Sequence, residues 1–155
     1  MTNVAKNYEV NKVSEISISY KSSRDISEMV NLRSSIDARD FIFPYFENFV
    51  EHHEEVWVLL MNRSNKCLGI FKVSQGGITD ALVDVRIVMQ VALKANATSM
   101  ILCHNHPSGN ATPSSQDDSL TRKIKSACTL FDIHFLDHLI ITSRLFYSYA
   151  DEGRL

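Results

Sequence analysis

Alternating and continuous runs of hydrophobic residues predict the strands of this chain. Residues 16–20 alternate apolar and polar positions after a polar, aperiodic tail over residues 1–12, which predicts a short edge strand. Continuous apolar runs at 56–61 and 70–73 are separated by Asn-Arg-Ser-Asn-Lys, a turn-like composition. We therefore expect these two runs to form a hairpin in a sheet that is covered on both faces.

Helical spacing appears in three further segments. The first covers residues 35–49, with Ser34 or Ser35 as its N-cap and Pro44 as the point where it kinks or stops. The other two cover residues 83–96, after the Gly76-Gly77 pair, and residues 114–130, with Thr112 or Ser114 near the cap. These helices are long enough to cover the faces of a sheet.

The rest of the chain contains a short buried strand and two closing strands. Residues 99–103 read as the buried strand, residues 104–113 as a loop, and residues 133–142 and 145–150 as the closing strands, hinged at 143–144. The mixed order of elements predicts an α/β fold with a mixed β-sheet sandwiched between helices. We expect one globular domain over residues 34–155, with residues 1–33 as a tail and edge strand.

Composition and charge narrow the class of protein. The chain has 155 residues, of which 45% are hydrophobic, so a single domain can bury a sizeable core. Sixteen Lys and Arg against eighteen Asp and Glu give a net charge of −2, which disfavours non-specific nucleic-acid binding. Three scattered cysteines do not make a disulfide framework. No signal peptide or membrane span is apparent, so we expect a cytoplasmic protein without a membrane partner.

Candidate chemistry is concentrated between Cys103 and Asp117. In strand geometry His104 and His106 point to one side, about 6.6 Å apart, and Cys103 points to the other. Asp117 follows eleven residues after His106, in the first turn of a predicted helix whose start is fixed by Pro113. Two histidines and one carboxylate suit a hydrolytic zinc site with a position left open for water.

A hydrolytic zinc site also needs a proton acceptor and a donor to the oxyanion. Ser114 shares a helix face with Asp117 and can be the donor. The acceptor candidates are Glu54 and Glu55, at the head of a buried strand, where partial desolvation raises a carboxyl pKa. Alternation does not choose between them, because both faces of the strand are equally apolar.

Other polar residues have simpler interpretations. His52 and His53 read as a solvated turn, Asp118 as exposed helix surface, and Arg122, Lys123 and Lys125 as a solvated helix face that could also attract an anionic partner. Asp137 and His138 lie in a predicted buried strand and therefore need hydrogen-bond partners. We expect a structural role for this pair, with support of the metal ligands as the alternative.

The run His-Asn-His-Pro-Ser-Gly, followed after three residues by Pro-Ser and after two more by Asp, resembles the signature of the JAB/MPN metalloprotease family, in its RadC-like branch. Similar stretches lie at residues 54–63, 76–79, 83–86, 136–142 and 150–153, so the resemblance covers about residues 50–155. It implies an α/β sandwich like that of cytidine deaminases. Full-length relatives carry an N-terminal helix-hairpin-helix region; this chain looks like a short form without it, which puts the label of DNA repair in doubt.

The resemblance also assigns roles to residues. It implies that His104, His106 and Asp117 bind one Zn²⁺ per chain, that Ser114 steadies the oxyanion, and that Glu54 rather than Glu55 is the proton shuttle. Around the ligands it places the loop and supporting residues Pro107, Ser108, Gly109, Pro113 and His138. The expected function is a zinc-dependent metallohydrolase of peptide or isopeptide-type substrates.

Two other functions are alternatives. The first is a non-proteolytic interaction module that acts with nucleic acid in DNA repair or mobile elements, although the net charge gives nucleic-acid binding no support. The second, a zinc nucleoside deaminase, is set aside because the chain has no Pro-Cys-x-x-Cys ligand pair. The pattern does not specify the oligomeric state.

Overall fold

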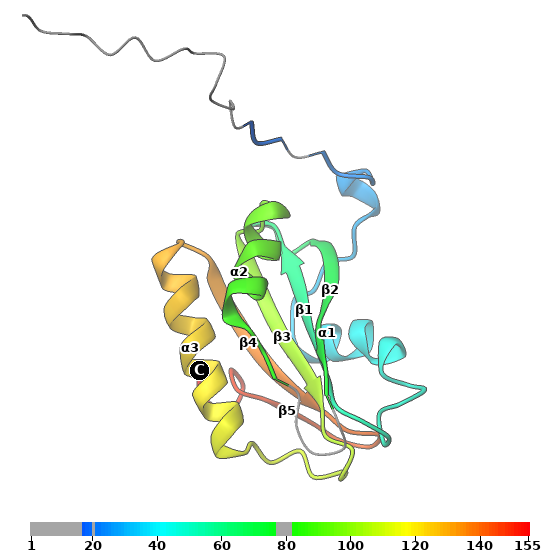
Figure 1. Cartoon of the computed structure of the whole chain (residues 1–155). Helices are drawn as coiled ribbons and strands as arrows, with labels where there is room; N and C mark the ends of the chain where they lie inside the picture. The colour runs from blue at the N-terminus through cyan, green and yellow to red at the C-terminus, as the bar shows by residue number, and fades with distance from the viewer. Residues whose placement is uncertain (1–16, 20, 77–81) are drawn as a thin grey trace, which may run out of the picture.

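A five-stranded mixed sheet organises the computed structural model, which describes residues 17–19, 21–76 and 82–155 (Figure 1). Its strand order is β2-β1-β3-β4-β5. The strands are β1 (Glu55–Met61), β2 (Cys67–Gln75), β3 (Ser99–Asn105), β4 (His134–Ile141) and β5 (Phe146–Ser148). Only β3 and β4 pair in parallel; the other neighbours are antiparallel. The predicted mixed α/β sheet is confirmed.

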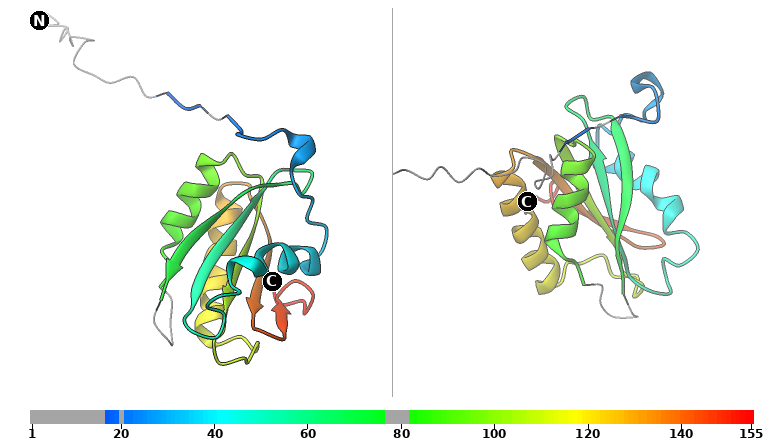
Figure 2. Two further views of the ribbon diagram at one scale, coloured as in Figure 1. Left: turned by 90° about the vertical axis from the view of Figure 1, so that its right-hand side faces the viewer. Right: turned by 45° about the horizontal axis from the view of Figure 1, so that its top comes forward.

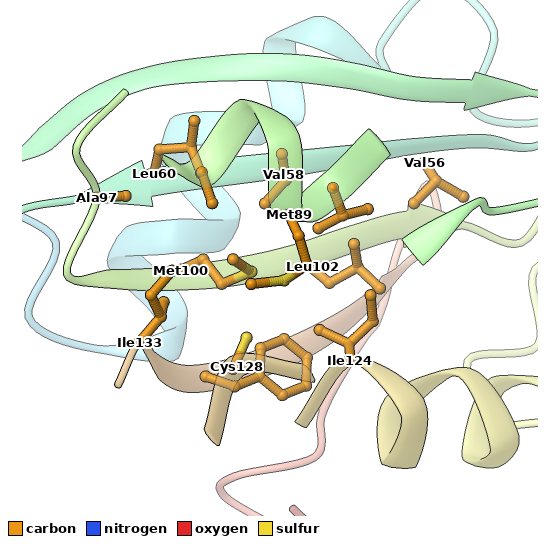
Figure 3. Packing of buried hydrophobic residues seen from close by; sticks show 13 residues of the cluster. Val56, Val58, Leu60, Met89, Ala97, Met100, Leu102, Ile124, Cys128 and Ile133 are labelled. Atoms are coloured by element: carbon orange, nitrogen blue, oxygen red, sulfur yellow. The ribbon is translucent and has the colours of Figure 1, made fainter. Parts of the chain in front are cut away.

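Helices cover both faces of the sheet (Figures 1 and 2). On one face α2 (Val85–Lys94) and α3 (Ser115–Leu130) pack against β1 and β3; on the other lies α1 (Ser35–Ile42). Figure 3 shows the first core layer, in which Ile124 and Cys128 of α3 meet Met100 and Leu102 of β3. Because helices cover it on both sides, all of β3 is buried, which explains the apolar run over residues 100–103 at its centre.

Local sequence signals set the helix boundaries. Ser34 caps α1 by accepting from the Asp37 amide, and the helix ends at Ile42, because Pro44 lacks the amide that a continuing helix needs; a 3₁₀ turn, η3 (Phe43–Tyr45), follows. Asp84 caps α2 by accepting from the Arg86 amide. These observations confirm the predicted start of the first helix and its early stop.

The hairpin of β1 and β2 forms as predicted, but the expectation that both faces are covered is wrong for β2. Within the hairpin turn, the Asn62 side chain accepts hydrogen bonds from the Ser64 and Lys66 amides. β2 is an edge strand, and its Phe71 is 37% exposed. A strand at the edge has one neighbour only, so its surroundings are more open than those of β1.

The predicted N-terminal edge strand falls partly on residues 16 and 20, which lie outside the described residues, as do the tail over 1–12 and Gly77. Residues 17–19 are described and are not a strand, and Ile18 is 97% exposed. The chain already contacts the domain before residue 34: Met29 and Leu32 are buried, and the Cys67 amide donates to the Val30 carbonyl. A further short turn, η2 (Ile26–Glu28), lies just before these contacts.

Two boundaries bear on function. β3 continues two residues beyond the predicted strand, so His104 and Asn105 belong to a strand and not to the loop.

All three cysteines are free and buried, and Cys103 packs in the layer that faces α1. Among the described residues, none of the helices has the length and apolar character needed to cross a bilayer.

Candidate metal centre

The end of β3 and the beginning of α3 bring three ligand-type side chains together. His104 lies near the end of β3, His106 directly follows the strand, and Asp117 lies in the first turn of α3. Nε2 of His104 is 2.9 Å from Nε2 of His106 and 3.1 Å from Oδ1 of Asp117, and Nε2 of His106 is 3.4 Å from Oδ2 of Asp117. This group could hold a metal ion.

A helix cap fixes Asp117. Ser114 is the N-cap of α3: its Oγ accepts from the Asp117 amide, and the Asp117 carboxylate accepts in return from the Ser114 amide at 2.7 Å. This reciprocal capping box holds both residues on the first turn of the helix. The Ser114 hydroxyl also donates to Oδ2 of Asp117 at 2.7 Å. Pro113 precedes the cap, so the predicted helix start is confirmed, with Ser114 and not Thr112 as the cap.

The loop between β3 and α3 closes over His106. The His106 amide donates to the Ile141 carbonyl, and the Gly109 amide donates to the His106 carbonyl. Gly109 has a φ of 77°, in the left-handed region that glycine adopts most readily. Pro107 and Ser108 line the cavity in front of the histidines, and Ser108 Oγ accepts from the Asn110 amide. These residues thus shape the loop around a ligand-type side chain.

Hydrogen bonding determines which nitrogen of each imidazole carries the proton. The hydroxyl proton of Thr121 goes to the Asp117 carbonyl at 2.7 Å, so Thr121 can only accept from Nδ1 of His138 at 2.6 Å. Nε2 of His138 is then an acceptor, and Nδ1 of His104 donates to it at 2.9 Å. This leaves the Nε2 of His104 as a lone pair that points toward His106.

The same reasoning applies to His106. Its Nδ1 lies 2.7 Å from the Asn110 carbonyl, which can only accept, so Nδ1 carries a proton, and in the neutral ring Nε2 is then a lone pair. With both rings neutral, two lone pairs and a carboxylate converge, and a metal ion or a proton between the atoms relieves their repulsion. Tetrahedral zinc with ligand bonds of about 2.0–2.1 Å places its ligand atoms about 3.3 Å apart. The separations of 2.9, 3.1 and 3.4 Å come close to that spacing.

The ionisation of these groups follows from burial and from their neighbours. Burial lowers the pKa of His104, and Asp117 offsets this only in part. Burial also acts to lower the pKa of His106, but hydrogen bonds to Asp117 and Asn110 outweigh it and raise that pKa. Burial acts to raise the pKa of Asp117, but both histidines outweigh it and hold that pKa well below its usual range. Asp117 is therefore a carboxylate, as a metal ligand must be.

His138 and its neighbours form a buried layer behind the ligands. His138 is fully buried, and its ring stacks on Tyr149 at 5.0 Å. Burial, together with His104, lowers the pKa of His138 well below its ordinary value, so its ring is neutral. For His138 the structure favours the alternative, support of a candidate ligand, because its ring bonds directly to His104. Asp137 has the expected structural role: its carboxylate accepts hydrogen bonds from Ser148 Oγ and the Ala150 amide.

Asp118 does not lie on a solvated helix surface as predicted. Its carboxylate accepts from the Tyr149 hydroxyl at 2.8 Å, and both of its oxygens accept from Nη2 of Arg154, at 2.9 and 3.0 Å. The C-terminal turn returns to α3 through these bonds, a tertiary contact that helical spacing does not reveal. Thr121, which contacts His138, was not predicted from the sequence, although its position one helical turn after Asp117 indicates that the two residues share a helix face.

Strand register places Glu54 and Glu55 on opposite faces of the sheet. Val56 lies opposite His104 in the antiparallel β1–β3 pair, and directly opposite residues share a face. Two residues before Val56, Glu54 returns to the His104 face and lines the same cavity as the histidines. Glu55 points the other way. The structure thus brings Glu54, and not Glu55, to the candidate metal centre.

Glu55 instead belongs to a buried polar cluster on the other face. It is 2% exposed and accepts from Lys72 Nζ at 2.7 Å and from Trp57 Nε1 at 2.9 Å, and its carboxylate also lies 3.2 Å from His53 Nε2. His53 stacks on Phe49, so the prediction that it lies in a solvated turn is wrong, whereas His52 is exposed. Sequence spacing did not reveal this cluster because Lys72 comes from β2.

A cavity of about 650 Å³ opens in front of the candidate ligands. Glu54, Ser114 and the three candidate ligands all line it. Its apolar wall is formed by Val56, Leu82, Val83 and Leu120. Lys123, on the exposed face of α3 together with Arg122 and Lys125, reaches the rim. A volume of this size is typical of small-molecule or peptide side-chain sites.

A family model and several known proteins match this sequence. A family model described as RadC-like JAB domain matches residues 32–154. A UPF0758 protein of Flavobacterium johnsoniae is 45% identical over 131 residues, which cover 84% of this chain and 56% of that protein. One from Porphyromonas gingivalis is 38% identical over 134 residues, covering 86% of this chain and 58% of that protein. One from Clostridium kluyveri is 33% identical over 151 residues, 97% of this chain and 65% of that protein.

The chain thus spans a little over half the length of the first two of these relatives. The match of the family model covers most of the chain, from the segment before α1 to the C-terminal turn. It includes β3, the loop and α3, which carry the candidate ligands. The chain belongs to the RadC-like JAB domain family.

Proposed function

We propose that this protein is a zinc-dependent hydrolase of peptide or isopeptide bonds. The observation that carries the proposal is the convergence of two imidazole Nε2 atoms and a carboxylate at the cavity that Glu54 also lines. Two histidines and one carboxylate are a ligand set of hydrolytic zinc, which leaves a position for water. Membership in the JAB domain family, some of whose members are metallohydrolases, supports the same chemistry.

In this proposal His104, His106 and Asp117 would hold the ion through Nε2, Nε2 and a carboxylate oxygen. When bound, zinc supplies a Lewis acid that polarises a carbonyl and lowers the pKa of water to about 7. The Glu54 carboxylate accepts a proton as the water oxygen forms its bond to the carbonyl carbon. It then delivers that proton to the amine nitrogen as the carbon–nitrogen bond breaks.

Ser114 would stabilise the negative charge that develops on the carbonyl oxygen. Its hydroxyl lies 2.7 Å from Oδ2 of Asp117, directly beside a candidate ligand, and it lines the cavity. Rotation of this hydroxyl proton toward the substrate oxygen provides an oxyanion donor. The capping box keeps the Ser114 backbone fixed while the hydroxyl turns.

The test compares metal-loaded wild type with Glu54→Gln and with Glu51→Gln, a control in the same segment whose side chain is exposed. Peptide and isopeptide-linked substrates are incubated with each protein, with and without a chelator. We expect chelator-sensitive hydrolysis that falls about 10²–10⁴-fold in Glu54→Gln while zinc stays bound, and is unchanged in Glu51→Gln. Absence of metal-dependent hydrolysis on every substrate, or full activity of Glu54→Gln, would overturn the proposal.

A further inference from the structure

Asn105, between the two candidate histidine ligands, has no part in the metal chemistry proposed above. It is fully buried, and its neighbours in β3 point to the opposite face of the sheet. A buried amide is costly unless its donors and acceptor find partners. Nδ2 of Asn105 donates to the carbonyls of Val50 and His53 at 3.0 and 2.8 Å, and its Oδ1 accepts from the Glu55 amide at 2.8 Å.

These partners fix the orientation of the Asn105 amide and show what it holds. Two carbonyls face the NH₂ group and one N–H faces the oxygen, so a flipped amide would lose all three bonds. All three partners lie in residues 50–55, the segment that leads into β1. Residues 50–54 are turn and extended residues before the strand, and Glu55 is the first residue of β1, so no helix holds this segment.

Two of the three bonds flank Glu54 directly. The His53 carbonyl belongs to the peptide unit before the Glu54 Cα, and the Glu55 amide belongs to the unit after it. The torsions φ and ψ of Glu54 are the rotations of these two units about its Cα, so anchoring both units fixes the direction of its Cα–Cβ bond, from which the side chain starts. From the β2 side, the Gly76 amide donates to the Glu54 carbonyl at 2.9 Å, which anchors the following unit again.

We infer that Asn105 is the positioning residue that aims the Glu54 carboxylate at the metal centre, an inference that rests on the proposed hydrolytic function. Three successive residues at the end of β3 have two different roles: His104 and His106, which directly follows the strand, would face the ion, and Asn105 between them holds the backbone that carries the proton shuttle. The distance between shuttle and ligands is thereby set by one tripeptide. A small displacement of a catalytic group can lower the rate about 10²-fold.

The test uses Asn105→Ala, with the milder Asn105→Ser in case the first does not fold. The matched control is Asn62→Ala, which removes an asparagine that also bonds two backbone amides, but in the hairpin turn far along the strand. In Asn105→Ala we expect kcat to fall about 10²-fold with KM and zinc affinity within about threefold of wild type. Asn62→Ala keeps wild-type kcat.

Two further readouts separate positioning from general stability. In the Glu54→Gln background the Asn105→Ala change should lower kcat no further, because a residue that acts through Glu54 has nothing left to position. Hydrogen exchange of the Glu55 amide in the metal-free protein should speed up about tenfold or more in Asn105→Ala and remain unchanged in Asn62→Ala.

The possible results are distinct. A kcat loss that adds fully to that of Glu54→Gln, or zinc affinity that falls as far as kcat, overturns the positioning role. Unchanged exchange of the Glu55 amide overturns it as well, even if no substrate is ever hydrolysed. If wild type hydrolyses nothing but the Glu55 amide is released in Asn105→Ala, the proposed function fails while Asn105 is shown to hold the segment.

Discussion

Replacing His138 by Phe tests the hydrogen-bond chain that orients His104. Phenylalanine keeps a ring to stack on Tyr149, but it removes the nitrogen that accepts from Nδ1 of His104 at 2.9 Å and the one that donates to Thr121 at 2.6 Å. We expect His104 to lose its preference for the tautomer that offers Nε2 as a lone pair. Zinc affinity should therefore fall, although His138 itself touches no metal.

The magnitude follows from burial. His138 is fully buried and His104 is 3% exposed, so water does not readily replace the lost acceptor. An unsatisfied buried donor costs about 1–3 kcal/mol, which we expect as the loss of unfolding free energy in the metal-free protein. Loss of the outer partner of a metal-ligating histidine typically lowers affinity about 10–100-fold, equivalent to about 1.4–2.7 kcal/mol. The two effects are measured separately.

Zinc affinity is measured by competition with a chromogenic chelator at neutral pH, and unfolding free energy by urea titration of the metal-free protein. His138→Gln is the control, since its side-chain oxygen can occupy the position of Nε2 and accept from His104. We expect His138→Gln to retain most of the affinity that His138→Phe loses. Zinc binding by His138→Phe within twofold of wild type would refute the reasoning, and equal losses in both variants would show that the acceptor is not what matters.

Three other expectations concern the metal, pH and the core. Zinc at one hundred times its Kd should raise the unfolding free energy by about 2.7 kcal/mol, an effect that a chelator reverses and that Asp117→Asn abolishes in thermal melts; a shift that survives Asp117→Asn would place the zinc elsewhere. Burial acts to raise the pKa of Glu55, but hydrogen bonds with Lys72, His53 and Trp57 outweigh it and lower that pKa from 4.5. A lowered carboxyl pKa stabilises the fold above the unfolded value, and this stability is lost as the pH falls through the folded value. Glu55→Gln should cost about 1–3 kcal/mol at pH 7, and urea titrations should show the difference from wild type shrinking below about pH 4.5; a difference independent of pH contradicts the ionised state of Glu55. Ile124 is fully buried between α3 and the sheet, so by urea titration we expect Ile124→Ala to lower the unfolding free energy by about 2–5 kcal/mol and Ile124→Val by about 0.5–1.5 kcal/mol. Similar losses in the two variants would contradict tight packing there.

Local signals in the sequence were sufficient to predict most of the elements. The apolar run at residues 56–61, the turn after it and the capping serines at positions 34 and 114 act over a few neighbouring residues, and each has its predicted effect. Pro44 ends α1 because its ring leaves no backbone amide to continue the helix. Such features depend little on which other segments pack nearby, so the sequence pattern reveals them directly.

Predictions failed where a distant segment determines the surroundings of a residue. β2 was expected to be covered on both faces, but its apolar run does not reveal that it lies at the edge of the sheet. Asp118 looks like helix surface until the C-terminal Arg154 returns to it. His53 looks solvated until Phe49 and Glu55 pack around it. In each case the missing information is a contact between residues whose proximity the local pattern does not encode.

The candidate centre shows both kinds of information. The spacing of His104, His106 and Asp117 by itself determined which side chains could share an ion, because strand alternation and a helix cap are local geometry. Which of Glu54 and Glu55 lies beside the histidines is visible only in the folded chain, because both faces of β1 are apolar and its register against β3 places Glu54 on the His104 face. The same register turns Asn105 toward the segment before β1, and the pairing of β4 with β3 brings His138 beside His104. Register joins strands about fifty or thirty-four residues apart, and no local periodicity contains it.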